Sequence, residues 1–118
     1  MKLVNLDNDS IIAEHIHVAD RFWNRLKGLM FTEDLPSDCG LHIRPCRGIH
    51  TFFMQYSIDV LHLDSRHQVV GIEENLQPGK TGKSFPRTAE IVELSAGKIQ
   101  KTGTKIGHRL KFQMETVL

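Results

Sequence analysis

The chain has 118 residues, of which 40% are hydrophobic and 25% charged, and its formal net charge is +1 at pH 7. This length fits one domain with one core, and the composition excludes disordered, collagen-like and coiled-coil chains. Because fifteen basic residues nearly balance fourteen acidic ones, no overall field favours nucleic acid or an anionic membrane, and we expect no nucleic-acid partner.

The amino-terminal residues lack the apolar stretch of a signal peptide, and no segment approaches the roughly 20 apolar residues of a membrane span. The sequence therefore predicts a cytoplasmic protein without a membrane anchor. Its two cysteines, Cys39 and Cys46, lack the CxxC or CxxH spacing of a zinc site, and in a reducing compartment we expect thiols rather than a disulfide. The sequence leaves any cofactor open.

Two apolar runs open the chain, at residues 2–6 and 10–18, and the turn residues Asp7-Asn8-Asp9 between them predict a hairpin. His15 and His17 lie two apart on the second predicted strand, so their rings point the same way, as two metal ligands would. No third ligand is evident, and a pair of exposed edge-strand histidines is the alternative to a metal site.

A short helix is predicted near residues 20–28, with Asp20 as its N-cap and Gly28 at its end. Trp23 borders its apolar stripe, and Arg25 points to the polar side. The following residues, 31–38, are polar and contain a proline, which indicates a loop.

Strands resume at Leu41, and residues 49–54 are apolar on both alternating faces, which predicts a central strand. His50 would share a face of this strand with Phe52 and Met54. An imidazole in apolar surroundings loses basicity and can act near neutral pH. A core histidine bonded to the backbone is the alternative.

Residues 58–63 and 68–76 predict a second hairpin around the turn at 64–67. Asp59 shares a face of the first strand with two leucines, so its carboxylate must be paired, and Arg25, Arg44 and Arg47 are candidate partners. Glu93, in a strand predicted at 88–94, shares its face with apolar residues, so its carboxylate needs a partner as well. Such pairs either fix the fold or belong to a functional site.

The segment 78–86, PGKTGKSFP, predicts a surface loop. GKTGKS is similar to a phosphate-binding loop, but position 77 is Gln where that motif needs Gly, and Phe85-Pro86 stands where a helix should begin. A solvated basic loop is the better interpretation. The remaining residues predict a turn at 95–97, one helical turn at 98–102 and a last strand at 109–115.

Together these elements predict a mostly β fold of the α+β class. We expect a compact single domain over residues 1–118, a β-barrel or sandwich-like fold of about seven short strands with one short helix near residues 20–28.

Spaced motifs connect this chain with a known family. They lie in the run RLKGLMFTEDLPSDCGLHIRPCRGIHTFFMQYSIDVLHLD, from Arg25 to Asp64, and continue through Asn75-Leu76-Gln77-Pro78, the turn at 93–97 and Gly107. Their order and spacing resemble the signature of the domain-of-unknown-function 192 family, also called uncharacterised protein family 0127, over nearly the whole chain. The resemblance implies a compact, mainly β domain with a small helical part, and it brings no settled activity, cofactor or partner.

The chain departs from the pattern of that family at two turns. Ser57 stands where Pro is frequent, and His108 stands where Asp usually follows Gly107. Neither change threatens the implied fold, but the second weakens any site placed at the closing turn.

The first functional hypothesis is a binding module with a cleft near the His50 strand, which holds a small anionic ligand or a peptide end. Arg25 and Arg44 would grip a carboxylate, His50 would orient it, and Trp23 and Phe52 would supply apolar contact.

Two other classes of function stay open. An enzyme, hydrolytic in kind, would use His50 as acid or base with Asp59 or Glu93 beside it. A protein-interaction scaffold would present an exposed strand edge or the loop at 78–86.

Overall fold

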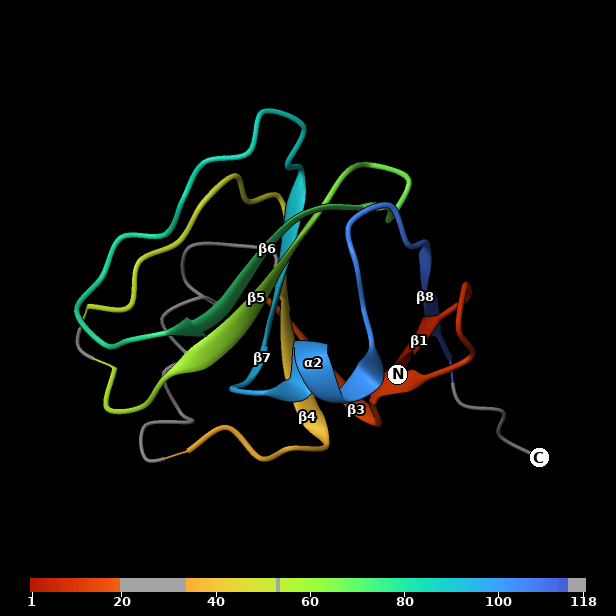
Figure 1. Ribbon diagram of the computed structural model, residues 1–118, viewed down its shortest axis with the longest axis horizontal. Coiled ribbons are helices and arrows are strands. Elements are labelled where there is room, and N and C mark those ends of the chain that lie inside the picture. Colours follow the sequence, from red (N-terminus) through yellow and green to blue (C-terminus); the bar gives the residue numbers. More distant parts are fainter. Residues whose placement is uncertain (20–33, 53, 115–118) are drawn as a thin grey trace.

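The computed structural model describes residues 1–19, 34–52 and 54–114. Within these ranges eight strands form a three-stranded and a five-stranded sheet, with one short helix, α2 (Lys98–Thr102), beside them (Figure 1). The smaller sheet has the order β2-β1-β8, and its strands are β1 (Lys2–Asn5), β2 (Ile11–Ala13) and β8 (Leu110–Gln113). The larger has the order β3-β4-β7-β5-β6, and its strands are β3 (His15–Ala19), β4 (Cys39–Ile43), β5 (Ile58–Leu63), β6 (Val69–Leu76) and β7 (Glu90–Ser95).

The expected mostly β fold is confirmed, and its form is two packed sheets rather than a closed barrel. The count of about seven strands is one short of what the described residues contain. The helix expected near residues 20–28 lies outside the described residues, whereas the helical turn expected at 98–102 is present as α2.

The opening hairpin is confirmed for β1 and β2, which pair antiparallel. The single strand expected over residues 10–18 is wrong, because the chain leaves the smaller sheet at Glu14 and continues as β3, parallel to β4 in the larger sheet. Alternation fails at the same point, since Ile12 and Ala13 are both buried. The amides of Glu14 and His15 both donate to the carbonyl of Asp38, and this redirects the strand.

Each face of the larger sheet carries its own hydrophobic cluster. One cluster lies between the two sheets and against α2, with members from both sheets: Leu3, Ile12, Ala13, Ile16, Leu61, Leu63, Val69, Val92, Leu94, Ile99 and Leu110. The other lies on the opposite face and is completed by residues outside the strands: Ala19, Leu35, Leu41, Ile43, Cys46, Ile49, Ile58, Val60 and Ile91. The hairpin β5–β6 is confirmed, and alternate residues of β5 serve the two clusters.

Candidate functional site

Two irregular segments run side by side over the outer face of the larger sheet, residues 44–52 and 77–88 (Figure 1). They are joined by an isolated bridge between His50 and Thr81, and the amide of Gly82 donates to the carbonyl of Ile49 at 2.9 Å. The central strand expected at 49–54 is therefore wrong, because this segment makes one bridge instead of a ladder. Thr51 ends it as a strand: its hydroxyl donates to the carbonyl of Gln77 at 2.6 Å, and its carbonyl accepts the amide of Met54.

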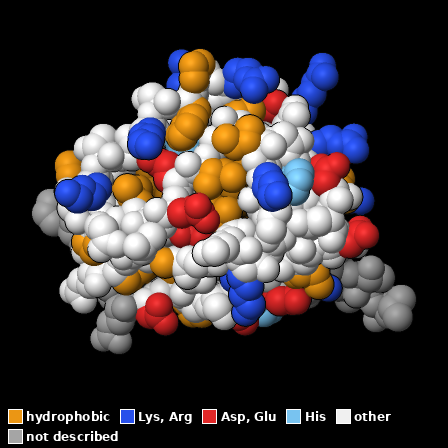
Figure 2. Space-filling view, viewed as in Figure 1, with side chains coloured by type: hydrophobic (Ala, Val, Ile, Leu, Met, Phe, Trp, Pro, Cys, Tyr) orange, Lys and Arg blue, Asp and Glu red, His pale blue; other side chains and the backbone are white. Residues whose placement is uncertain are grey.

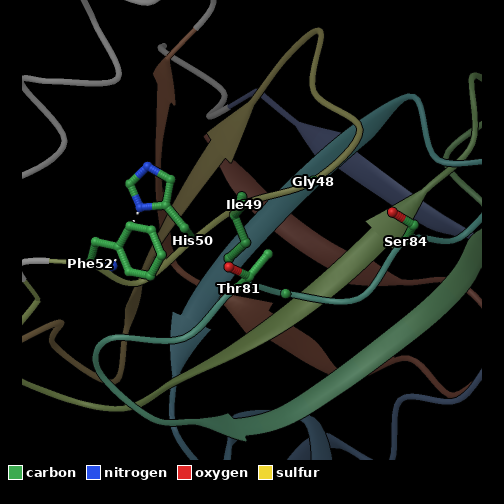
Figure 3. A pocket seen from close by; sticks show the side chains of 7 residues that line it. Gly48, Ile49, His50, Phe52, Thr81 and Ser84 are labelled. Carbon is green, nitrogen blue, oxygen red and sulfur yellow. Dashed lines mark hydrogen bonds between the residues drawn. The ribbon is translucent and has the colours of Figure 1, made fainter.

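A hollow of about 390 Å³ opens between the two segments. Its lining comes from both of them: Gly48, Ile49, His50, Phe52, Thr81, Gly82 and Ser84. Figure 3 shows His50 and Phe52 together at one side, Ser84 at the other, and Ile49 with Thr81 between them. A Cβ added at Gly48 would meet no atom within 4 Å, so the space beside this glycine is open.

His50 and Phe52 form a pair of stacked rings at the mouth of the hollow. Their centroids are 4.7 Å apart with an interplanar angle of 24°, and Phe52 is 44% exposed. The expectation of a buried, desolvated His50 is wrong, because its residue is exposed and the strand that would bury it does not form. The amide of Phe52 donates to Nδ1 of His50 at 3.3 Å. The proton of the neutral ring therefore sits on Nε2, which makes no hydrogen bond with a described residue.

The hydroxyl groups of Thr81 and Ser84 are also unengaged. Both residues are exposed and line the hollow, and within the described ranges neither hydroxyl has a hydrogen-bond partner. The residues that line the hollow thus carry one imidazole N–H and two hydroxyls that are not engaged within the described ranges.

The two segments that border the hollow are basic, although no Lys or Arg is among the residues that line it. Residues 44–52 and 77–87 contain no Asp or Glu, and their charged residues are Arg44, Arg47, Lys80, Lys83 and Arg87. Figure 2 shows Lys and Arg side chains along the upper edge of the view, and the 77–88 segment runs along the left part of that edge in Figure 1. Although the net charge of the whole chain is near zero, this region carries a local positive potential.

A buried polar chain fastens the second wall to the sheet. Nε2 of His62 lies 3.0 Å from Oε2 of Glu73, and Nδ1 of His62 lies 3.1 Å from the hydroxyl of Thr88. The other oxygen of Glu73 accepts the amide of Lys83 at 2.5 Å, and the Phe85 ring lies against that of His62 with centroids 4.4 Å apart. These contacts hold residues 83–88 on β5 and β6.

The order acid, imidazole, hydroxyl resembles that of a hydrolytic triad, but the geometry gives it a structural role. His62 is fully buried and Thr88 is 4% exposed, so the hydroxyl cannot reach a substrate in the hollow. This buried chain of hydrogen bonds was not predicted from the sequence. The available signal was the alternation of β5, which places His62 on one face with Ile58 and Val60 and so predicts a buried imidazole needing partners.

Asp59 is fully buried, as its strand face predicted, but its partners are backbone amides and not an arginine. Oδ1 accepts from the amide of Asn75 at 2.8 Å, and Oδ2 accepts from those of Gly97 and Ile99 at 3.1 and 2.9 Å. The carboxylate thus satisfies the free N–H groups at the start of α2, which has no side-chain cap of its own. Asp59 holds the fold together and is not free to assist His50.

Glu93 and Arg44 are placed away from the lining of the hollow. Glu93 pairs in register with Val60 and Leu41 on the outer face of the larger sheet. Burial raises the pKa of Tyr56 to about 12, with the charges of Glu93 and Asp34 adding to the effect. Arg44 is exposed just beyond β4. Trp23 and Arg25 lie outside the described residues.

A second histidine cluster lies between the sheets. His42 of β4 is 1% exposed, and its ring stacks on Phe112 of β8 with centroids 4.0 Å apart and an interplanar angle of 9°. Its Nε2 and that of His67 approach Oε1 of Glu90 at 2.5 and 3.2 Å. Burial lowers the pKa of His42, and the positive charges of Arg44 and His67 act in the same direction, against Glu90.

The candidate metal pair projects from β3, where His15 and His17 are both exposed. Nε2 of His15 lies 3.9 Å from Oδ2 of Asp38. In the ranges that the structure covers, no group of three or more His, Cys, Asp or Glu residues is arranged to hold a metal ion. Neither cysteine is joined in a disulfide. The Cys46 thiol donates to the carbonyl of Gly48 at 3.1 Å, and burial, with Asp38 adding to it, raises the pKa of Cys39.

His108, one of the two departures from the family pattern, acts as a hydrogen-bond acceptor. Its Nδ1 lies 3.0 Å from the side-chain amide of the fully buried Asn5 and accepts the backbone amide of Lys105 at 3.2 Å. A carboxylate could accept the same two N–H groups. The imidazole therefore fills an acceptor role that a carboxylate could also fill.

Known proteins are similar to this chain in sequence. The model of the family DUF192, described as "Uncharacterized ACR, COG1430", matches residues 4–112. The chain belongs to the DUF192 family. Two archaeal relatives, both UPF0127 proteins, are similar over nearly the whole chain: that of Thermococcus sibiricus is 30% identical over 96% of this chain and 75% of its own length, and that of Pyrococcus horikoshii is 33% identical over 93% and 97%.

A solved structure shares the fold of this chain. It is a protein of unknown function from Novosphingobium aromaticivorans, and it matches with a TM-score of 0.78 and 17% sequence identity over 94% of this chain and 82% of its own. The resemblance seen in the motifs is therefore confirmed, and so is the fold it implied. No helix in the described segments of this DUF192 chain is long and apolar enough to cross a membrane.

Proposed function

We propose that this protein is a binding module whose site is the hollow between residues 48–52 and 81–84, and that it takes a small anionic ligand or the carboxylate end of a peptide. The observation that carries the proposal is that residues lining this hollow hold three hydrogen-bond donors without a partner among the described residues. They are Nε2 of His50 and the hydroxyls of Thr81 and Ser84.

The charge around these donors supports an anion over a cation. Both walls carry basic residues and no acidic one. The nearest buried carboxylate, Glu73, lies behind the backbone of Gly82 and Lys83, where its oxygens are occupied by the amide of Lys83 and by His62. A ligand carboxylate would therefore meet hydroxyl donors in a positive potential.

The enzymatic alternative has less support. His50 is accessible and could exchange protons, but Asp59 is committed to three backbone amides. Glu93 is not among the residues that line the hollow. Without a carboxylate to orient it, His50 serves better as a hydrogen-bond donor to a ligand than as a catalytic base.

A titration followed by amide NMR tests the proposal. Acetate, inorganic phosphate, benzoate and a tripeptide with a free carboxyl end would each be added to the ¹⁵N-labelled protein. We expect at least one of them to shift the amides of His50, Thr81 and Ser84 in a saturable way. The same probes would be added to Gly48→Leu, which fills the hollow from a position with open space around it, and to Ser65→Leu, an exposed control in the β5–β6 turn.

The proposal requires that Gly48→Leu abolishes these shifts and that Ser65→Leu keeps them. If none of the four probes moves the three amides, or if the shifts persist in Gly48→Leu, the hollow is not a binding site for small anions.

We also propose that the protein works in the cytoplasm. The support comes from Cys39 and Cys46, neither of which is joined in a disulfide. Buried or partly buried thiols that are not joined as a disulfide are typical of a reducing compartment. Fractionation of the source cells, with detection of the native protein, checks this location.

A further inference from the structure

The rings at the mouth of the hollow indicate the shape of its ligand. Phe52 exposes 44% of its surface in a chain whose core otherwise buries most large apolar side chains. His50 stacks on it within 4.7 Å, and the backbone amide of Phe52 fixes the imidazole through Nδ1. The pair thus forms a stack of two exposed rings at one side of the hollow.

From this geometry we infer that the ligand is a flat ring that carries an anionic group, such as an aromatic carboxylate. This inference rests on the proposed function and adds a substrate class to it. The ring of the ligand lies against the Phe52 and His50 pair, because aromatic rings prefer offset or edge contacts with one another. The floor at this point is apolar, since Ile49 also lines the hollow.

The anionic group lies across the hollow from the rings. Ser84 stands at the opposite side in Figure 3, with Thr81 between, and their unengaged hydroxyls donate to the carboxylate. Lys80 and Lys83 come from the same short segment and are exposed, so their ammonium groups add positive potential at that end. The site is therefore apolar and flat at one end and hydrogen-bonding and positive at the other.

Four probes separate the parts of this inference: benzoate, cyclohexanecarboxylate, benzamide and acetate. Benzoate has both the flat ring and the charge, cyclohexanecarboxylate lacks the flatness, benzamide lacks the charge, and acetate lacks the ring. We expect benzoate to bind roughly fivefold or more tightly than each of the others, as measured by the saturable amide shifts of His50, Thr81 and Ser84.

Variants at Phe52 test the stacking directly. Phe52→Leu keeps an apolar side chain without a ring, and we expect it to remove the preference for benzoate over cyclohexanecarboxylate while binding of both carboxylates persists. Phe52→Trp keeps a ring and should retain the preference. Because Phe52 is exposed, neither substitution disturbs the core.

The outcomes distinguish this inference from the function on which it rests. Equal binding of benzoate and cyclohexanecarboxylate to the wild-type protein would overturn the flat-ring inference and leave an anion site. Equal binding of benzamide and benzoate would overturn the anionic part. If none of the carboxylates binds, the flat-ring inference fails, and the proposed function fails as well when inorganic phosphate and the tripeptide also leave the three amides unshifted.

Discussion

The buried imidazole of His42 pairs with the partly buried carboxylate of Glu90 on the neighbouring strand, with Nε2 and Oε1 2.5 Å apart. Since the carboxylate accepts a hydrogen bond from Nε2, the neutral ring keeps its lone pair on Nδ1. This buried atom has no hydrogen-bond partner in the part of the chain that the structure describes. Protonation of Nδ1 would place an unsatisfied N–H beside Phe112, in the interface of the two sheets.

This relationship predicts a loss of stability in mild acid. Burial lowers the pKa of His42 in the folded protein, whereas a histidine in the unfolded chain has a pKa of about 6.5. Below that pH the unfolded state binds more protons, so the free energy of unfolding falls as the pH drops, by at most about 1.4 kcal/mol per pH unit for this one group. Urea unfolding at a series of pH values from neutrality down to mild acid measures the slope.

The matched variant is His42→Phe, which keeps a flat ring against Phe112 and removes the titrating group. We expect a shallower loss of stability with acid in this variant. His15→Asn, which changes an exposed histidine, should keep the wild-type slope. Equal slopes in His42→Phe and the wild-type protein would assign the acid sensitivity to other groups.

The alternation of side chains along strands and the turn residues between them predicted much of the fold, because both signals are local in the sequence. They gave the hairpins β1–β2 and β5–β6, the turn that ends in α2 and the exposed pair His15 and His17. The break between β2 and β3 at Glu14 was not predicted, because it depends on hydrogen bonds to the carbonyl of Asp38, which lies 24 positions further along the chain. The strand predicted from the apolar pattern at 49–54 does not form for the same reason: it depends on residues distant in the sequence. The hydroxyl of Thr51 contacts backbone carbonyls of the 77–80 segment.

The candidate site was partly visible in the sequence. His50 and Phe52 do line one hollow together, although as an exposed stacked pair and not as a buried strand face. Thr81 and Ser84 were seen only as part of a failed phosphate-loop motif, because nothing local places them opposite His50. The buried roles of His62 and Glu73 depend on strand pairing, which composition and spacing do not reveal.

Substitution of Asp59 tests its role at the start of α2. In Asp59→Asn one acceptor oxygen becomes an NH₂ group that faces backbone N–H donors, so buried hydrogen bonds are lost. We expect the free energy of unfolding to fall by about 3 kcal/mol, and hydrogen exchange at the amide of Ile99 to accelerate. Glu74→Gln, on an exposed side chain of β6, should change stability by less than about 0.5 kcal/mol. A similar small effect at Asp59 would show that the helix does not depend on this carboxylate.

The buried chain of Glu73, His62 and Thr88 predicts a looser wall when its acceptor is removed. Glu73→Gln weakens the bond to the amide of Lys83, and we expect a loss of about 2 kcal/mol in stability and at least roughly tenfold faster exchange of that amide. Thr88→Val removes the hydroxyl bonded to His62 and should cost about 1 kcal/mol. The same substitution at Thr81, whose hydroxyl is unengaged and exposed, serves as the control. Unchanged exchange at Lys83 in Glu73→Gln would mean that other contacts seat the wall.

Packing of the Phe85 ring against Gly71 also holds residues 83–88 in place. A Cβ added at Gly71 would lie 2.5 to 2.6 Å from three atoms of the Phe85 ring, which covers His62. The backbone of Gly71 is not in the left-handed region, so Gly71→Ala acts through this clash alone, and we expect a loss of about 1–3 kcal/mol. Gly48→Ala, where a Cβ meets nothing within 4 Å, should be near neutral.

Double substitution separates the clash from a general effect of losing glycine. Phe85→Leu opens room at the position that the new methyl group would occupy, so Gly71→Ala combined with Phe85→Leu should be more stable than the sum of the two single losses, by about 1 kcal/mol. Urea unfolding of the four proteins in this cycle gives the coupling. Strict additivity would show that the Phe85 ring moves aside freely, and that the wall of the hollow is held by the hydrogen bonds of Glu73 and Thr88 rather than by packing.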